Sequence, residues 1–200
     1  AAKLCQLGYL SPVSGQRKHD GQPTRVLPAA ELLLPGAHNI ENVLAAMAAV
    51  DGAVDVPTMR QVASSFTGVE HRIEPVRTLN GVKWYNDSIA SSPTRTIAGL
   101  HSFSQKLVLL AGGYDKKISY APLAPEILAH VRLLILMGPT GPIIEREVRT
   151  LPEFADSGLV ILHAANMEEA VQLAFQNTVP GDIVTLSPAS ASFDAYPNFE

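Results

Sequence analysis

From residue 72 onward, the chain alternates between short apolar runs and stretches with helical spacing, and this alternation limits the fold more than any other feature. Two of the runs, Leu107–Leu110 and Leu133–Leu136, contain no polar residue. Such runs are typical of strands that are buried on both faces of a parallel sheet. Strands and helices in alternation predict a doubly wound α/β domain, in which ligands bind at the carboxyl ends of the strands.

The pattern places the individual elements of this region as follows. Strands are expected at 73–79, 82–85, 106–111, 131–137, 160–163 and 182–186. Helices are expected at 94–103, 123–129, 142–149 and 167–176. The last helix has a clear beginning, because Asn166 is a good N-cap and Glu169 completes a capping box.

The first part of the chain has a different pattern. Residues 1–34 are polar and punctuated by Gly and Pro, which favours short strands or hairpins. Apolar residues then recur at helical spacing, at Ile40, Val43, Leu44 and Met47. This spacing predicts an amphipathic helix with Asn39 as its N-cap, and a second helix is expected after Pro57.

The change of pattern at Val69–Arg72 indicates a domain boundary. We therefore expect two domains, one at residues 1–70 and one at residues 71–200. The chain starts without an obvious domain beginning, so the first part is expected to be the tail of a longer domain.

Composition excludes several classes of protein. Lys and Arg total 15 against 19 Asp and Glu, and no basic block stands out, so nucleic acid is not expected as a partner. The single cysteine, Cys5, cannot form an internal disulfide and fits a reducing compartment. No apolar run is long enough to span a bilayer and no secretory leader is visible, so a cytoplasmic protein is expected, with no membrane contact.

Four loops follow expected strand ends and carry residues that suit anions and polar ligands. They lie at 86–92, 112–117, 138–141 and 187–194. Paired glycines let a backbone approach a ligand closely, and lysines neutralise carboxylate or phosphate. In the first loop, Ser92 and Pro93 predict a capped helix N-terminus, which attracts anions. Each loop alone is equally consistent with an ordinary turn, but four on one edge of a sheet favour a binding site.

Several common site motifs are missing from the sequence. The six histidines never approach metal-ligand spacing, so no metal site is expected. No dinucleotide fingerprint, P-loop or nucleophile elbow occurs either. The residues by themselves therefore predict an α/β domain with an anion-binding edge.

Five motifs in one order resemble the Mur ligase family, from about Leu34 to the end of the chain. They are Gly36–Asn42, Gly68–Arg72, Tyr85–Ser88, Gly112–Lys116, and Leu186–Asp194 with Asn198–Glu200. Within the family, the resemblance is strongest to the members that add D-glutamate. Each motif alone would be weak, but five in register make chance a poor explanation.

The resemblance implies a three-domain, ATP-dependent acid–amino-acid ligase of peptidoglycan synthesis, and thus a role in cell-wall formation, cell shape and cell division. This chain would be the end of the central ATPase domain followed by most of a Rossmann-like C-terminal domain, and inactive alone. The substrates would be ATP, UDP-N-acetylmuramoyl-L-alanine and D-glutamate, joined through an acyl phosphate by a monomeric enzyme. The P-loop and the Mg²⁺ ligands would lie upstream.

The resemblance also implies roles for individual residues. The ATP-binding residues would be Asn39 and Asn42 at the adenine, Arg72 at the phosphates and Asp87 at the ribose hydroxyls. His71, beside Arg72, would only brace the hinge. The D-glutamate-binding residues would be Ser91, Lys116, Ser192, Phe193 and Phe199. No catalytic residue or metal ligand is expected in this chain.

Two positions depart from the family pattern. Ile89 stands where many members carry Lys, so one carboxylate contact would be missing or supplied by Lys117 or Arg95. Ser190 replaces a common Cys and leaves the backbone role intact. Two alternatives stay open: a Mur-type or folylpolyglutamate-type ligase that adds another amino acid, and a non-catalytic nucleotide-binding α/β module.

Overall fold

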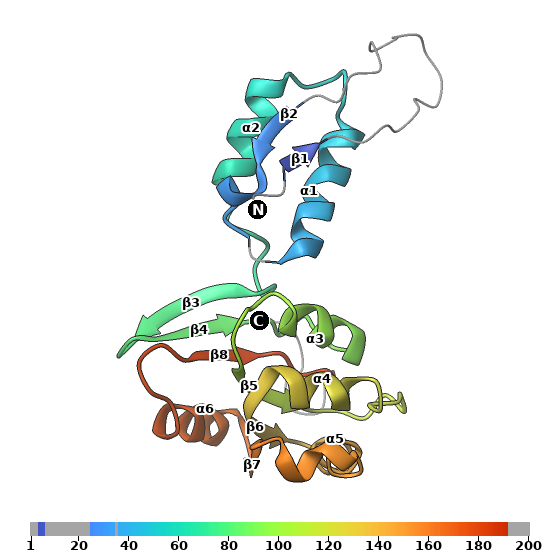
Figure 1. The fold of residues 1–200 in the computed structure, drawn as a ribbon, viewed down its shortest axis with the longest axis vertical. Coiled ribbons are helices and arrows are strands. Elements are labelled where there is room, and N and C mark those ends of the chain that lie inside the picture. The colour runs from blue at the N-terminus through green and yellow to red at the C-terminus, as the bar shows by residue number, and fades with distance from the viewer. Residues whose placement is uncertain (1–3, 7–24, 35, 192–200) are drawn as a thin grey trace. The chain divides into compact units, whose positions relative to one another are not determined.

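The computed structural model describes residues 4–6, 25–34 and 36–191 (Figure 1). Contacts divide the chain into two compact units, Ala1–Gly68 and Val69–Glu200, and each is described by itself. Three residues expected at the D-glutamate site, Ser192, Phe193 and Phe199, lie outside the described residues. None of the helices in the described part is long and apolar enough to cross a membrane.

The first unit is a small α/β assembly. Strands β1 (Leu4–Gln6) and β2 (Arg25–Pro28) pair antiparallel, and η1 (Ala29–Glu31), α1 (Ala37–Ala49) and α2 (Val56–Ser65) follow. Its core contains Val26, Leu27, Met47, Met59 and Ala63. The N-cap of α1 is Gly36, so the expectation that Asn39 caps this helix is wrong and Asn39 lies in its first turn.

The second unit is built on a six-stranded sheet in the order β3-β4-β8-β5-β6-β7. The strands are β3 (Glu74–Leu79), β4 (Val82–Asn86), β5 (Leu107–Gly112), β6 (Val131–Met137), β7 (Val160–His163) and β8 (Ile183–Leu186). Only β3 runs antiparallel to its neighbour among these strands. The expectation of a doubly wound, mostly parallel sheet is confirmed.

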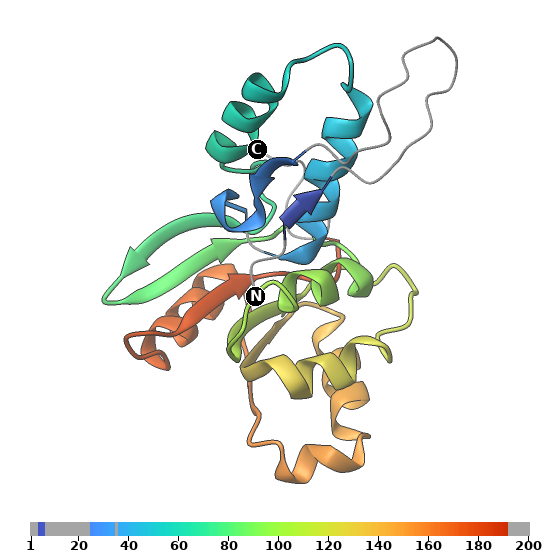
Figure 2. The same ribbon diagram turned by 45° about the horizontal axis from the view of Figure 1, so that its top comes forward.

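Helices cover both faces of this sheet (Figures 1 and 2). They are α3 (Pro93–Leu100), α4 (Leu123–His130), α5 (Gly141–Arg149) and α6 (Met167–Gln176), and η2 (Pro152–Asp156) follows α5. The steps from β4 to β5, β6 and β7 all run one way along the sheet, and right-handed crossovers therefore put α3, α4 and α5 on one face. The return from β7 to β8 reverses direction, so α6 covers the other face.

The two apolar runs noted in the sequence are the central strands β5 and β6. In β5, Leu107 and Leu109 pack with α3, α4 and α5, whereas Val108 and Leu110 pack with α6. All six residues of β5 are buried. An uninterrupted apolar run is required here because successive side chains point to opposite faces and both faces are covered.

Two expected helix caps behave differently in the structure. Asn166 caps α6 as expected, and its Oδ1 accepts from the Glu169 backbone N–H at 2.9 Å. Ser92 occupies the N-cap position of α3, but its side chain makes no capping hydrogen bond. Helix α3 ends at Leu100, three residues before the expected end, with His101 as C-cap.

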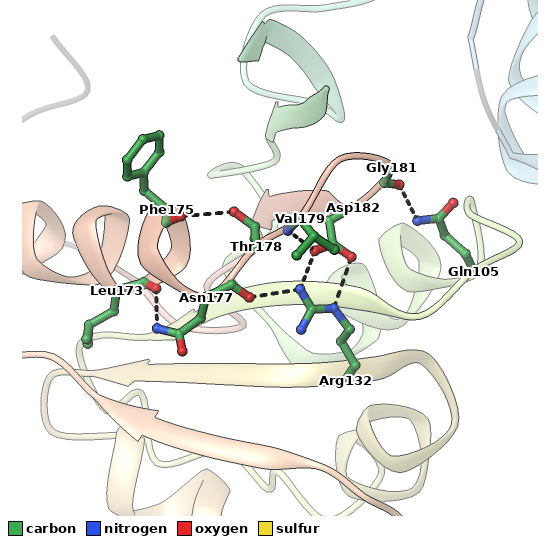
Figure 3. Close-up of polar contacts among 9 residues, drawn as sticks. All are labelled: Gln105, Arg132, Leu173, Phe175, Asn177, Thr178, Val179, Gly181 and Asp182. Atoms are coloured by element: carbon green, nitrogen blue, oxygen red, sulfur yellow. Dashed lines mark hydrogen bonds and ion pairs between the residues drawn. The ribbon is translucent and has the colours of Figure 1, made fainter. Parts of the chain in front are cut away.

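An ion pair ties the connection between α6 and β8 to the start of β6. Figure 3 shows the Arg132 guanidinium facing the Asp182 carboxylate. The same guanidinium donates to the Asn177 carbonyl at 3.0 Å, and Asp182 also accepts from the Val179 backbone N–H at 2.7 Å. The Asp182 side chain is only 12% exposed, so this contact is more shielded from water than an ordinary surface pair.

Replacing Arg132 by alanine is expected to lower the free energy of unfolding by about 2 kcal/mol, because a largely buried carboxylate loses its charged partner. Urea unfolding followed by the fluorescence of Trp84, the single tryptophan, measures this. Arg146→Ala is the matched control: Arg146 pairs with Glu147 at 3.4 Å but is 67% exposed, so a loss below about 0.5 kcal/mol is expected. Equal losses in both variants would contradict the prediction.

Candidate functional site

Four parallel strands, β4, β8, β5 and β6, end side by side and bring the four expected loops to one edge of the sheet, here called the rim. Backbone hydrogen bonds join the loops directly. Gly112 N–H donates to the Pro188 carbonyl at 2.8 Å, and Ala189 N–H donates to the Ala90 carbonyl at 2.9 Å. The expectation that residues distant in sequence converge at the carboxyl strand ends therefore holds for the described residues.

The paired glycines at the end of β5 allow close contact between backbone segments. A Cβ on Gly112 would lie 2.0 Å from the Met137 carbonyl oxygen, and one on Gly113 would lie 2.3 Å from the Ala191 carbonyl oxygen. Both glycines also have positive φ angles, of 110° and 146°. The sequence pattern predicts that these glycines let a ligand approach, whereas the structure accounts for both by the packing of neighbouring loops.

A buried chain of hydroxyl groups lies beneath the rim. The Ser190 Oγ lies 2.8 Å from the Tyr120 hydroxyl and 2.9 Å from Thr140 Oγ1. Thr140 Oγ1 also accepts from the Gly113 backbone N–H at 2.9 Å. Three loops are thereby held together by polar contacts in a dry environment, where such networks rigidify a structure. The sequence gives no signal for Tyr120, which is 70 residues from its partner Ser190.

Asp87, directly after β4, is buried with 4% of its surface exposed. Its Oδ2 accepts from Ser187 Oγ at 2.7 Å, and its Oδ1 accepts from the Ile73 backbone N–H at 3.2 Å. Burial raises the pKa of Asp87 above its ordinary value, although these hydrogen bonds and the charges of Arg72 and Arg95 oppose the rise. The expected ribose ligand is thus engaged by its own chain on both carboxylate oxygens.

The raised pKa of Asp87 predicts the direction in which the free energy of unfolding changes with pH. The folded state holds the proton more tightly than the unfolded chain, so Asp87 lowers the free energy of unfolding as pH rises from about 4 through the raised pKa. Asn at this position does not titrate. The free energy of unfolding of the unsubstituted chain, minus that of Asp87→Asn, is therefore expected to fall between pH 4 and pH 7.

The control for this prediction is Asp115→Asn. Hydrogen bonds from Lys117 lower the pKa of Asp115, so the corresponding difference changes mainly below about pH 4 and is expected to stay nearly level between pH 4 and pH 7. Urea unfolding at several pH values, followed by Trp84 fluorescence, gives both curves. A difference for Asp87→Asn that rises with pH would contradict the assignment.

Arg72 lies in a strongly tethered turn. Its neighbours His71 and Ile73 have φ angles of 65° and 46°, which are unusual for residues other than glycine. The turn is held by His71 N–H, which donates to Glu74 Oε2 at 2.9 Å, and by Asn86 Nδ2, which lies 2.9 Å from His71 Nδ1. His71 therefore braces this segment, and the Arg72 side chain is exposed.

Two of the residues expected at D-glutamate lie together on the rim. The Lys116 ammonium donates to the Ser91 carbonyl at 3.0 Å, and the lysine is exposed. The adjacent Lys117 is instead paired with Asp115 at 2.9 Å. An ammonium group has three donors, so Lys116 keeps donors for a ligand.

The remaining expected residues lie in the first unit. Asn39 is buried near the start of α1, and Asn42 lies one turn later. Asn42 Nδ2 donates to Asn39 Oδ1 at 3.5 Å, so the two carboxamides of this pair are neighbours on one helix.

The described part of the rim does not fit a Mg²⁺ ion. Magnesium requires oxygen ligands at octahedral positions, commonly from one or two carboxylates with water and phosphate. Asp87 at the described rim is buried and engaged by Ile73 and Ser187, and Asp115 is paired with Lys117. Glu74, which pairs with Asn86 at this edge, accepts from the His71 backbone N–H. A cavity of about 240 Å³ lies elsewhere, on the β3–β4 hairpin beside Arg77 and Trp84, and it contains no expected site residue.

Comparison with known proteins identifies a family model and close relatives. Residues 71–190 match the model described as Mur ligase, glutamate ligase domain. The UDP-N-acetylmuramoylalanine--D-glutamate ligase of Acetivibrio thermocellus is 54% identical over 184 residues, which are 90% of this chain and 40% of that protein. The enzyme of the same name from Symbiobacterium thermophilum is 52% identical over 92% of this chain and 40% of its own length. The chain thus spans about 40% of the length of these curated relatives.

Solved structures share the fold at low sequence identity. The UDP-N-acetylmuramate-alanine ligase of Thermotoga maritima superposes with a TM-score of 0.63 at 16% identity, over 79% of this chain and 36% of that one. The Mycobacterium tuberculosis folylpolyglutamate synthase gives a TM-score of 0.61 at 15% identity, over 82% and 40% of the two chains. At these identities the likeness concerns the fold alone.

Proposed function

This chain belongs to the Mur ligase family, and from that premise we propose that it is part of an ATP-dependent ligase that joins D-glutamate to UDP-N-acetylmuramoyl-L-alanine in peptidoglycan synthesis. The observation that carries the proposal is the 54% identity to a D-glutamate ligase over 90% of this chain. The proposal includes a cytoplasmic, monomeric enzyme. It also treats residues 1–70 as the end of the central ATP-binding domain and residues 71–200 as the C-terminal ligase domain.

The proposed reaction has two steps. A carboxylate oxygen of the nucleotide substrate attacks the γ-phosphorus of ATP, which forms an acyl phosphate and releases ADP. The neutral amine of D-glutamate then attacks the acyl carbon, phosphate leaves, the nitrogen loses a proton and an amide forms. Catalysis of this kind depends on positioning and on neutralising phosphoryl charge.

The residues of this chain contribute binding groups to that reaction. We propose that Lys116 holds a carboxylate of D-glutamate beside Ser91, because its ammonium already lies at the Ser91 carbonyl. Ser192, Phe193 and Phe199 complete this set as the family resemblance implies.

For ATP, Arg72 reaches the phosphates from its tethered turn. Asp87 positions that turn through the Ile73 N–H, and it reaches the ribose hydroxyls only if its present contacts open. Asn39 and Asn42 contact the adenine. The Mg²⁺ required with ATP is held by residues outside this chain.

The amino-acid specificity needs a test, because Ile89 stands where many family members carry a lysine. Arg95 supports D-glutamate as substrate, because its Nη1 donates to the Ile89 carbonyl at 3.2 Å and so brings a cation to this loop. Lys117 is paired with Asp115, so it is less suited than Arg95 to replace the lysine that many family members carry at position 89.

A hybrid ligase tests the proposal. In it, this chain replaces the matched segment of the Acetivibrio thermocellus relative, and the product is identified by mass spectrometry with ATP, the nucleotide substrate and a panel of amino acids. We expect the hybrid to add D-glutamate in preference to the other amino acids. A folded hybrid that prefers another amino acid would favour the alternative ligase, and one that releases no phosphate with any of them would contradict the proposal.

The 200-residue chain alone is expected to give no turnover, because it contains no P-loop motif to hold the triphosphate. Phosphate release is measured on mixing the chain with ATP, the nucleotide substrate and D-glutamate. The unmodified relative serves as the positive control. Phosphate release by the chain alone would contradict this prediction.

A further inference from the structure

Three potential metal ligands converge on the surface between helices α3 and α4. Glu126 and His130 lie one turn apart on α4, and His101 is the C-cap of α3. His101 Nε2 lies 2.6 Å from Glu126 Oε2, and His130 Nε2 lies 3.6 Å from the same oxygen. One ligand atom from each of the three residues lies within 4.8 Å of the other two.

The backbone beneath these side chains is fixed by the core. Leu100, directly before His101, packs with Leu123 and Ile127 of α4. The α4 residues are 0% exposed and Leu100 is 1% exposed, so the two helix ends cannot separate without opening the core. The three side chains project from this support and are 31–50% exposed, which leaves them accessible to an ion.

The local electrostatics favour a cation at this point. His101 caps the C-terminus of α3, and His130 is in the last turn of α4, so the negative ends of two helix dipoles meet here. Glu126 adds a carboxylate. The position is at the amino ends of β5 and β6, opposite the rim, because α3 precedes β5 and α4 ends directly before β6.

We propose that His101, Glu126 and His130 bind a divalent transition-metal ion of the Zn²⁺ class. Two neutral imidazoles and a carboxylate are ligands that Zn²⁺ prefers, and three protein ligands leave a fourth position for water. At zinc–ligand distances of about 2.0–2.1 Å, tetrahedral ligand atoms lie about 3.4 Å apart. The Glu126–His130 spacing of 3.6 Å is close to this, and the ion replaces the shorter His101–Glu126 hydrogen bond.

Sequence spacing does not reveal this site. His101 and Glu126 are 25 residues apart, and only α3–α4 packing brings them together. The expectation of no metal ligands rests on linear spacing, and this cluster is the exception that the described residues contain. The inference is independent of the ligase reaction, because no residue of the cluster lies on the rim.

The chain offers a matched control. His163 Nε2 lies 2.6 Å from Glu145 Oε2, the same separation as His101 and Glu126, and His163 is 52% exposed. No third metal-binding side chain joins this pair among the described residues. A histidine–carboxylate pair without a third ligand therefore serves as the reference for nonspecific zinc binding.

The test titrates the tag-free 200-residue chain with Zn²⁺ in a calorimeter. The background chain carries Cys5→Ser, His19→Ala and His38→Ala, so that these other potential zinc ligands do not contribute. One ion per chain is expected. His101→Ala, Glu126→Gln and His130→Ala are each expected to weaken binding by at least about tenfold, whereas His163→Ala leaves it unchanged. A zinc affinity in Glu126→Gln and His130→Ala equal to that of the background chain, or a loss of affinity in His163→Ala, would overturn the proposal.

A second measurement keeps the proposal testable if a variant folds poorly. In the background chain with His101, Glu126 and His130 intact, zinc is expected to shift the imidazole ¹⁵N resonances of His101 and His130 and to leave those of His163 in place. Shifts confined to other histidines, or no saturable shift, would overturn the site. Neither readout depends on ligase activity, so this proposal and the proposed function fail separately.

Discussion

Replacing Gly112 by alanine is expected to destabilise the second unit by more than about 4 kcal/mol, or to prevent it from folding. The new methyl group would lie 2.0 Å from the carbonyl oxygen of Met137, a backbone atom of the neighbouring strand β6. Gly112 pairs with Met137 between two central strands, so neither partner can move without opening the sheet. Its φ of 110° adds strain that any residue with a Cβ would feel.

Gly181→Ala separates the clash from the backbone strain. Gly181 has a similar φ of 98°, but no described atom lies within 4 Å of the position of its Cβ. A loss of about 1–2 kcal/mol is expected there from conformation alone. Urea unfolding followed by Trp84 fluorescence compares the two variants, and circular dichroism reports whether Gly112→Ala folds. Similar losses of unfolding free energy in Gly112→Ala and Gly181→Ala would show that β5 and β6 separate easily at Gly112.

Replacing Lys116 by alanine in the hybrid ligase is expected to raise the KM for D-glutamate about ten- to a hundred-fold, with a much smaller effect on the KM for ATP. Loss of a charge-assisted hydrogen bond costs about 1.5–3 kcal/mol, which corresponds to this factor. A lysine suits the task because its point charge holds a carboxylate without competing for the reacting amine. Initial rates at varied D-glutamate and ATP give both constants.

Lys117→Ala is the control, because it removes the same charge one residue away. Lys117 is 87% exposed and paired with Asp115, so its loss is expected to leave the KM for D-glutamate within about twofold. Equal changes in both variants would indicate a general effect of charge. No change in Lys116→Ala would remove Lys116 from the D-glutamate site.

Gly112 and Lys116 lie close together in the sequence but have different roles. Gly112 belongs to the framework, since it permits β5 and β6 to meet. Lys116 lies four residues later and exposed, where it affects binding with little effect on stability. The hydroxyl chain from Tyr120 through Ser190 to Thr140 lies beneath both and holds the loops in place.

The elements of the second unit and the edge at which they converge could be predicted from the amino-acid sequence. Apolar runs such as Leu107–Leu110 can be satisfied only where both faces of a strand are covered, and helices between them force parallel strands. Parallel strands bring their carboxyl ends together, so the loops containing Asp87 and Lys116 could be assigned to one edge. These are consequences of local periodicity.

The contacts between side chains could not be predicted in this way, because they depend on the packing of the folded chain. Strand β8 inserts between β4 and β5, and this order brings Ser187 to Asp87 and Ser190 to Tyr120. The same is true of His101 and Glu126, which meet where two helices end. Periodicity reports how each segment is buried, but it carries no information on which segments become neighbours. Contacts between distant residues are fixed by strand order and helix packing, which depend on the energy of the whole fold.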